Sequence, residues 1–297
     1  MMREELNGVF VPVTTPYCED GSVNFAALKK NIEFYASTGL AGCHVLGTNG
    51  ENKSLSMDEK LHIVKKVLKY RGNLKIIAGC AFESTWETIE AASEFASLGV
   101  DYITLMAPSY YKQRMTDRAL FGYFTDVASS AGVPCIVYNA PMYCGGIVLS
   151  PELVKELCGH ENIVAMKDSS VGNIENYLAA IDGRIDLLAG SANFFLNALI
   201  SGCSGGVISL STVFPELVVK LYELFAAKEY DEAFCLNKRI LRLNKAISGK
   251  HGVAGVKYAM DLVGLSGGEP RAPLMPLDEN DKRNMADFLV KEGMLHA

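Results

Sequence analysis

Lys167 is the residue of this 297-residue chain whose position raises the clearest chemical question. It ends the short apolar run NIVAMK (162–167) and is followed by Asp168, Ser169 and Ser170. Desolvation at the end of a buried strand disfavours the charged ammonium and lowers its pKa, so a free amine becomes available near neutral pH. Such an amine attacks carbonyl carbons and forms a Schiff base. The alternative is a lysine that extends to solvent or pairs with a carboxylate.

Tyr138 is the candidate proton shuttle for this chemistry, which moves protons as the carbinolamine forms, as water leaves and as the enamine forms. It stands near the end of the apolar run VPCIVYN (133–139). Adjacent strands lie about 4.8 Å apart, so Tyr138 is within side-chain reach of the lysine. A phenol alone is a poor base, and Thr48 and Tyr111 are the hydroxyl groups available to assist it. Alternatively, Tyr138 only packs as an aromatic at a strand end.

Two glycine-rich stretches are candidates for binding an anion. In GTNGE (47–51) the unobstructed backbone N–H groups, the Thr48 hydroxyl and the Asn49 amide suit a small carboxylate, although the stretch is also a plausible tight turn. SGCSGG (201–206) precedes a strand and suits a phosphate, as in other barrels. We favour tight packing of a helix against a strand for this second stretch.

The pattern of the whole chain predicts an α/β protein that positions these residues at strand ends. Short runs rich in valine and isoleucine alternate with amphipathic segments, as expected for parallel strands covered on both faces. Helix starts are marked by capping boxes at Ser56 with Glu59 and at Ser84 with Glu87. The expected strands are residues 8–14, 41–47, 74–79, 101–107, 133–139, 162–167, 185–190 and 205–210.

Eight successive β-α units without a low-complexity linker favour a (β/α)8 TIM barrel over an open doubly wound sheet. The first turn has no G-x-G-x-x-G pattern, which argues against a dinucleotide-binding sheet. We assign residues 1–226 to the barrel and residues 227–297 to a C-terminal helical bundle. Barrel enzymes carry their active sites at the carboxyl ends of the strands, so the candidate residues converge there.

Composition narrows the function classes. A net charge of −6 argues against a nucleic-acid or anionic-membrane partner, and no apolar run is long enough for a transmembrane helix. The eight cysteines are scattered without C-x-x-C spacing, and the five histidines form no paired cluster. We therefore expect a reduced, cytoplasmic protein with no metal site and no secretory signal.

Taken together and in order, six motifs resemble the pyruvate-dependent class I aldolase family that includes dihydrodipicolinate synthase and N-acetylneuraminate lyase. The resemblance covers essentially the whole chain and implies a (β/α)8 barrel with C-terminal helices, assembled as a homotetramer of tight dimers. The motifs are GTNGE (47–51), Tyr110-Tyr111, YNAP (138–141), MKDSS (166–170), AGS (189–191) and GGVIS (205–209).

The resemblance implies roles for individual residues. Lys167 forms the Schiff base with pyruvate or another 2-oxo acid, and no other cofactor is needed. Tyr138 shuttles protons, and Thr48 links it to Tyr111, which crosses the tight-dimer interface in the family. Thr48 and Asn49 bind the carboxylate of the 2-oxo acid.

Further residues are implied to line the pocket, and they bear on the subfamily. Gly190 and Ile208 lie beside the enamine, and Ser191 helps with the distal polar end of the substrate. Dihydrodipicolinate synthases usually have an arginine where this chain has Tyr143, and usually a threonine where it has Asn49. Sialic acid lyases usually have an ALSG-like stretch after the same turn, and this chain has PMYCGG.

Several stretches look more like the 4-hydroxy-2-oxoglutarate aldolases, namely TNGE, SYYKQRM, AMKDS, LLAGSA and GGEPRAPL. Our first hypothesis is therefore cleavage of a 4-hydroxy-2-oxo acid to pyruvate and an aldehyde such as glyoxylate. The alternatives are condensation of pyruvate with aspartate semialdehyde by a 4-hydroxy-tetrahydrodipicolinate synthase, and an aldolase for 2-keto-3-deoxy sugar acids or sialic acid. A barrel that has lost catalysis is a further alternative, although Lys167, Tyr138 and Thr48 are all present.

Overall fold

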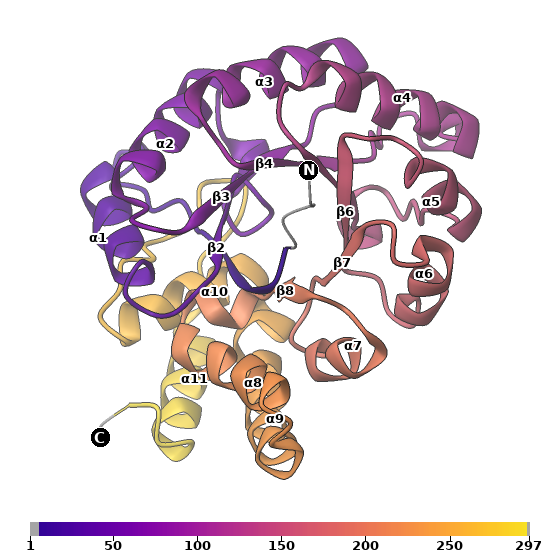
Figure 1. The fold of residues 1–297 in the computed structure, drawn as a ribbon. Helices are drawn as coiled ribbons and strands as arrows, with labels where there is room; N and C mark the ends of the chain where they lie inside the picture. Colours follow the sequence, from indigo (N-terminus) through magenta and orange to yellow (C-terminus); the bar gives the residue numbers. More distant parts are fainter. Residues whose placement is uncertain (1–5, 296–297) are drawn as a thin grey trace.

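The computed structural model describes residues 6–295 and confirms the expected barrel. Within them, the strands close a parallel barrel in the sequence order β1 to β8, with helices around the outside (Figure 1). The strands are β1 (Gly8–Pro12), β2 (Gly42–Val45), β3 (Lys75–Cys80), β4 (Tyr102–Met106), β5 (Cys135–Asn139), β6 (Ile163–Asp168), β7 (Asp186–Ala189) and β8 (Gly205–Val207). The helices are α1 (Phe25–Tyr35), α2 (Met57–Tyr70), α3 (Thr85–Leu98), α4 (Asp117–Ser130), α5 (Pro151–Leu157), α6 (Ile174–Ile181), α7 (Phe195–Ser201), α8 (Pro215–Ala226), α9 (Tyr230–Asn244), α10 (Lys250–Leu262) and α11 (Glu279–Lys291).

The helix starts follow the cap signals in the sequence. Ser56 and Glu59 form a full capping box at the start of α2, because each side chain bonds the backbone N–H of the other. At the start of α3, Ser84 Oγ accepts the N–H of Glu87.

Five strands end earlier than we expected: β1 at Pro12, β4 at Met106 and β7 at Ala189, in addition to β2 and β8. β2 stops at Val45 because the next residue, Leu46, has a left-handed conformation with φ of 57°. β8 stops at Val207, and Ser209–Thr212 forms a 3-10 turn. The expected ends at residues 47 and 210 were wrong, because apolar composition does not reveal where a backbone leaves the sheet.

Side chains inside the barrel form a core of their own, separate from the larger core between strands and helices. Seven strands each contribute one buried residue to it, and Leu6 closes its lower end. These strand residues are Phe10, Ile77, Tyr102, Ile136, Ala165, Leu188 and Val207. Because side chains alternate along a strand, the residues two positions further on also face inward, at the carboxyl end. Lys167, Tyr138 and Gly190 are three of them.

An irregularity between β5 and β6 sets the pairing that matters for the site. Cys135 pairs with Ile163, but Ile136 already pairs with Ala165, so β6 contains one extra residue. From that point the register is regular, and it places Tyr138 directly opposite Lys167.

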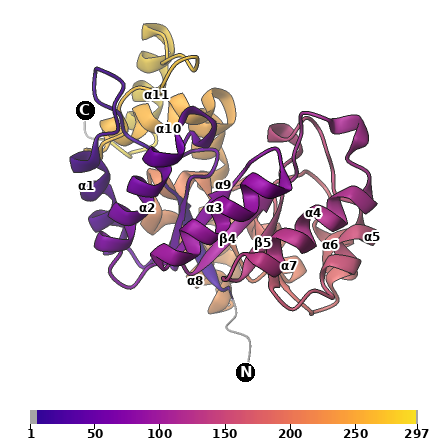
Figure 2. The same ribbon diagram turned by 90° about the horizontal axis from the view of Figure 1, so that it is seen from above.

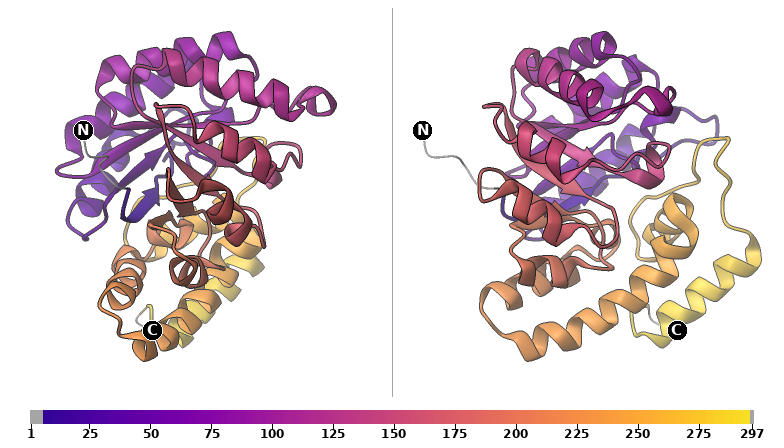
Figure 3. Two further views of the ribbon diagram at one scale, coloured as in Figure 1. Left: turned by 45° about the vertical axis from the view of Figure 1, so that its right-hand side comes forward. Right: turned by 90° about the vertical axis from the view of Figure 1, so that its right-hand side faces the viewer.

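The last quarter of the chain forms helices that pack beside the barrel and return to it. After α10, the chain passes α1, where Lys30 and Asn31 donate to the carbonyls of Gly264 and Ser266 (Figure 2). The connection before α11 then extends along the barrel, as the right-hand view of Figure 3 shows. Among residues 6–295, no helix has the length and apolar character needed to cross a bilayer.

Candidate active site

Lys167 lies near the carboxyl end of β6, inside the barrel mouth. Its side chain is almost fully buried, with 5% relative exposure, and Nζ lies 3.9 Å from the centre of the Tyr138 ring. Burial away from water lowers the pKa of Lys167 from 10.5 to about 7. A large share of the molecules therefore carry a neutral amine at neutral pH, which is the form that attacks a carbonyl.

The Tyr138 hydroxyl is held by two other hydroxyl groups. Ser169 Oγ lies 3.3 Å from it, and the Thr48 side chain is a second hydrogen-bond partner. Burial raises the pKa of Tyr138, and these bonds only partly oppose the rise. The phenol therefore stays protonated at neutral pH, and it can exchange a proton with a neighbouring oxygen or nitrogen. Ser169 was not among the proton-shuttle candidates from the sequence, although it directly follows the Lys167-Asp168 pair.

The GTNGE turn brings Thr48 and Asn49 toward this group. The turn closes on itself, since Gly50 N–H bonds the carbonyl of Gly47 at 3.1 Å and Glu51 N–H bonds that of Thr48 at 3.0 Å. The backbone N–H groups of Thr48 and Asn49 are then the groups of this turn that could donate hydrogen bonds to a bound anion. The Asn49 amide donates to Ser209 Oγ, 2.9 Å away, so the turn is also tied to the end of β8.

Gly190 allows β7 to approach the residues that follow Lys167. Its N–H donates to the carbonyl of Asp168 at 2.7 Å, and Ser169 Oγ lies 3.4 Å from its carbonyl oxygen. A Cβ at residue 190 would lie 1.9 Å from Ser169 Oγ, so only glycine fits. Ser191 Oγ accepts the N–H of Asn193 within the same loop.

Behind Lys167 and Tyr138, Asn139 and Asp168 join the ends of β5 and β6. Asn139 donates to Asp168 Oδ1 at 2.7 Å and accepts the N–H of Leu149 at 3.1 Å. The Tyr177 hydroxyl on α6 receives a bond from Asn139 and donates to the carbonyl of Leu149. Asn139 directly follows Tyr138, and Asp168 directly follows Lys167, so this hydrogen-bond network fixes the positions of Tyr138 and Lys167.

His44 is a buried neighbour that the sequence reasoning passed over. Its Nε2 lies 2.9 Å from Thr104 Oγ1, and its ring contacts that of Tyr138 edge-on at 6.4 Å. Burial and the charge of Lys167 hold the pKa of His44 well below its usual value, so the imidazole is neutral. The inward position of His44 on β2 would have revealed it, had strand parity been traced residue by residue.

The remaining expected residues lie around the mouth or in the core. Tyr111 is 68% exposed in the protomer and packs edge-on against Tyr110. Tyr143 is half exposed in the short 3-10 turn Pro141–Tyr143. Ile208 is fully buried, and its side chain belongs to the core between strands and helices. Its N–H bonds the carbonyl of Phe10, and its carbonyl accepts the N–H and hydroxyl of Ser211, so the expected place of Ile208 beside the enamine finds no support here.

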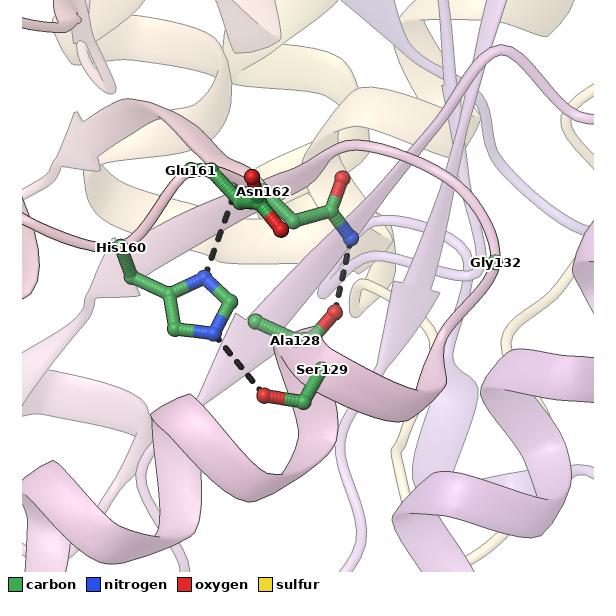
Figure 4. A pocket seen from close by; sticks show the side chains of 6 residues that line it. All are labelled: Ala128, Ser129, Gly132, His160, Glu161 and Asn162. Carbon is green, nitrogen blue, oxygen red and sulfur yellow. Dashed lines mark hydrogen bonds between the residues drawn. The ribbon is translucent and has the colours of Figure 1, made fainter.

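A polar hollow at the other end of the barrel does not belong to this site. Figure 4 shows the His160 ring between Ser129 and Asn162, with hydrogen bonds of 2.9 Å and 3.2 Å. Asn162 immediately precedes β6, whereas Lys167 lies at the far end of that strand. The SGCSGG stretch also lies at this end, where a Cβ at Gly205 would meet the Gly8 carbonyl oxygen at 2.1 Å. Close packing of β8 on β1 therefore explains Gly205. A Cβ at Gly206 would meet the Phe195 ring of α7 at 2.9 Å, and Gly202 ends α7 in a left-handed conformation with φ of 115°.

Comparison with known proteins agrees with this arrangement. Residues 5–292 match the model of the dihydrodipicolinate synthetase family. The chain is 30% identical to an uncharacterised DapA-like lyase from Thermococcus onnurineus, over 97% of this chain and 99% of that protein. It is 31% identical to a 4-hydroxy-tetrahydrodipicolinate synthase from Methanothrix thermoacetophila, over 96% of both chains.

A solved structure extends the likeness to three dimensions. Dihydrodipicolinate synthase from Acinetobacter baumannii, crystallised with pyruvate, superposes with a TM-score of 0.92 at 27% identity. The superposition covers 98% of this chain and all of that one. These names do not single out the 4-hydroxy-2-oxoglutarate aldolases that several motifs suggested. The chain belongs to the dihydrodipicolinate synthetase family and is a class I, Schiff-base-forming lyase.

Proposed function

We propose that Lys167 forms the Schiff base, with pyruvate as the 2-oxo acid. The observation that carries this proposal is the buried Lys167 amine stacked on a hydroxyl-bonded tyrosine. The amine attacks C2 of pyruvate to form a carbinolamine, which loses water to give an iminium. Loss of a C3 proton then gives an enamine, whose C3 attacks the carbon of an aldehyde. Water hydrolyses the product iminium and returns the amine.

Tyr138 supplies and removes the protons of these steps. Its ring lies against the lysine nitrogen, and its hydroxyl is linked to Thr48 and Ser169. In the synthetic direction it protonates the aldehyde oxygen as the carbon–carbon bond forms. In the cleavage direction it removes the proton from the C4 hydroxyl. Thr48 and Asn49 hold the pyruvate carboxylate at the turn, where backbone N–H groups and two polar side chains converge.

The Schiff base is tested by intact mass after incubation with pyruvate and borohydride. Wild type gains one reduced pyruvyl group, which peptide mapping locates at Lys167, and Lys167→Ala gains none. Lys257 is a matched internal control, because it is buried and engaged by Glu51. Absence of an adduct on wild type, or an adduct that persists in Lys167→Ala, sinks the proposal.

For the aldehyde, we propose aspartate semialdehyde, which would make the chain a 4-hydroxy-tetrahydrodipicolinate synthase. The relatives named above support this reading over the cleavage reaction that we first favoured. A cation is also at hand for the distal carboxylate. Lys112 Nζ lies beside the loop that follows Tyr143, since a Cβ at Gly146 would be 3.2 Å from it.

Lys112→Ala should raise KM for aspartate semialdehyde at least tenfold and leave KM for pyruvate unchanged, because only the aldehyde carries a distal carboxylate. Lys112→Arg should retain affinity. Arg114→Ala, on the same exposed turn, is the matched control. If Lys112→Ala and Arg114→Ala changed KM for aspartate semialdehyde equally, Lys112 would not be the residue that binds the distal carboxylate.

Cleavage of 4-hydroxy-2-oxoglutarate to pyruvate and glyoxylate is the second candidate, because the stretches SYYKQRM, LLAGSA and GGEPRAPL look like those aldolases, although Tyr143 is the usual residue of neither group. The two candidates are separated by kcat/KM for each reaction, measured on the same enzyme preparation. The reaction with the higher value by tenfold or more is the function.

We also propose that the active enzyme is a homotetramer built from tight dimers, in which Tyr111 reaches the neighbouring site. Its exposure of 68% in one protomer leaves the ring free for such a contact. Sedimentation measured alongside activity tests this assembly. A fully active monomer would exclude the role of Tyr111.

A further inference from the structure

Lys257 on α10 is a fully buried lysine that the chemistry above does not use. Its ammonium donates to Glu51 Oε1 at 2.7 Å and to the carbonyl oxygens of Thr15 and Glu269, each at 2.9 Å. It also lies 4.5 Å from the centre of the Tyr17 ring. All three ammonium protons thus have acceptors, and these come from segments far apart in the chain.

Glu51 is equally enclosed. Its side chain is fully buried, and its second oxygen accepts the backbone N–H of Arg271 at 2.8 Å. The Arg271 guanidinium lies 4.4 Å from the centre of the Tyr17 ring, which Lys257 also contacts. It also bonds Glu59 and the carbonyl of Ser54. Both oxygens of the Glu51 carboxylate are therefore bonded by residues of the C-terminal part of the chain, Oε1 by Lys257 and Oε2 by Arg271.

Stability alone does not account for the buried Lys257–Glu51 pair, which indicates that the pair serves to hold the turn in place. Removing two charges from water is costly, so a buried ion pair adds little net stability compared with apolar side chains. Glu51 also has φ of 54°, a left-handed conformation that is strained for a residue with a side chain. These costs fall on the last residue of the GTNGE turn.

Short bonds connect the pair to the substrate-binding residues. Glu51 N–H bonds the carbonyl of Thr48 at 3.0 Å, and Thr15 Oγ1 bonds the carbonyl of Gly50 at 2.7 Å. Lys257 contacts both Glu51 and Thr15, so it fixes the turn at two points. Thr48 in turn bonds the Tyr138 hydroxyl.

We propose that Lys257 is a positioning residue of the active site, which acts through Glu51 to hold Thr48 and Asn49 in the conformation that receives the 2-oxo acid carboxylate. The C-terminal helices thereby complete a site whose catalytic side chains all belong to the barrel. This inference rests on the proposed Schiff-base function for its catalytic readout, and on the geometry alone for its structural one.

The test compares a charge-neutral double variant with a stability control. Lys257→Met alone leaves Glu51 buried without a counter-charge and can fail to fold. The double variant Lys257→Met, Glu51→Gln removes both charges and keeps the volume. Leu289→Ala, in the buried face of α11, weakens the same C-terminal helices without touching the turn.

Two readouts are measured on each folded variant: KM for pyruvate with kcat, and hydrogen exchange of the peptide covering residues 47–51. We expect the double variant to raise KM for pyruvate at least tenfold and to accelerate exchange in the turn at least tenfold. Leu289→Ala should leave both within twofold of wild type while lowering Tm. A double variant that behaves like Leu289→Ala overturns the proposal.

The two proposals fail separately. If wild type forms no pyruvate adduct, the Schiff-base function is wrong, but the exchange measurement still decides whether Lys257 fixes the turn. If the adduct forms normally and turn exchange is unchanged in the double variant, only the positioning role is lost.

Discussion

The pH dependence of Schiff-base formation is the most direct consequence of burying Lys167. With a pKa of about 7, about half of the molecules carry the free amine at pH 7, against roughly one in 3,000 for a lysine with a pKa of 10.5. The free fraction rises about fivefold from pH 6 to pH 7 and less than twofold from pH 7 to pH 8. An ordinary lysine would gain tenfold in each interval.

The assay is the initial rate of reductive trapping with pyruvate and cyanoborohydride between pH 6 and pH 9, followed by intact mass. We expect a plateau above about pH 8, with half the maximal rate near pH 7. Lys167→Ala supplies the background at each pH. A rate that still climbs tenfold per unit between pH 8 and pH 9 would refute the argument from burial.

The burial of Lys167 also makes the stability of the folded protein depend on pH. Between pH 10.5 and about pH 7 the unfolded chain holds a proton on Lys167 that the folded chain does not, so stability falls as the pH is lowered across this window. Lys167→Met removes the penalty, which is at most about 5 kcal/mol at neutral pH. Its Tm at pH 7 should exceed that of wild type, and the difference should shrink toward pH 10. A lower Tm at pH 7 would contradict this account.

Three further substitutions test the groups around the lysine. Tyr138→Phe removes the proposed proton shuttle but keeps the ring, so kcat should fall about 10²- to 10⁴-fold with the trapping midpoint unchanged; a loss below tenfold would point to another shuttle. Gly190→Ala forces a Cβ against Ser169 and should lower stability by about 1–3 kcal/mol in urea unfolding together with kcat. Asn139→Ala leaves the Leu149 N–H unpaired and should cost about 1–3 kcal/mol, with unchanged stability counting against the network.

The sequence predicted the barrel because its signals are local and repeated. Each strand is a short apolar run, and most helices carry a cap residue that can be read one at a time. The rule that barrel active sites lie at the carboxyl ends of the strands then predicts that Lys167, Tyr138 and Thr48 meet at one mouth. Those residues do meet in the structure, with the ring of Tyr138 against Lys167 and its hydroxyl bonded to Thr48.

What the sequence could not predict depends on contacts between distant segments. The Lys257–Glu51 pair joins residues 206 positions apart, and no local pattern marks either as buried. His44 differs from this pair, because the alternation of side chains along β2 indicates its inward position. The early ends of β2 and β8 follow from the backbone conformation of Leu46 and from the turn after β8, which composition does not encode.

The extra residue in β6 constrains how this chain can change through evolution or engineering. Loops of a barrel tolerate insertions, because an added residue changes the path of the loop and leaves the strands in place. An odd insertion or deletion between residues 163 and 166 would instead reverse the parity of the strand and turn Lys167 out of the barrel, toward the helices. The amine would then be lost without any substitution of a catalytic residue. Length variation is therefore compatible with activity on either side of β6, but not within it.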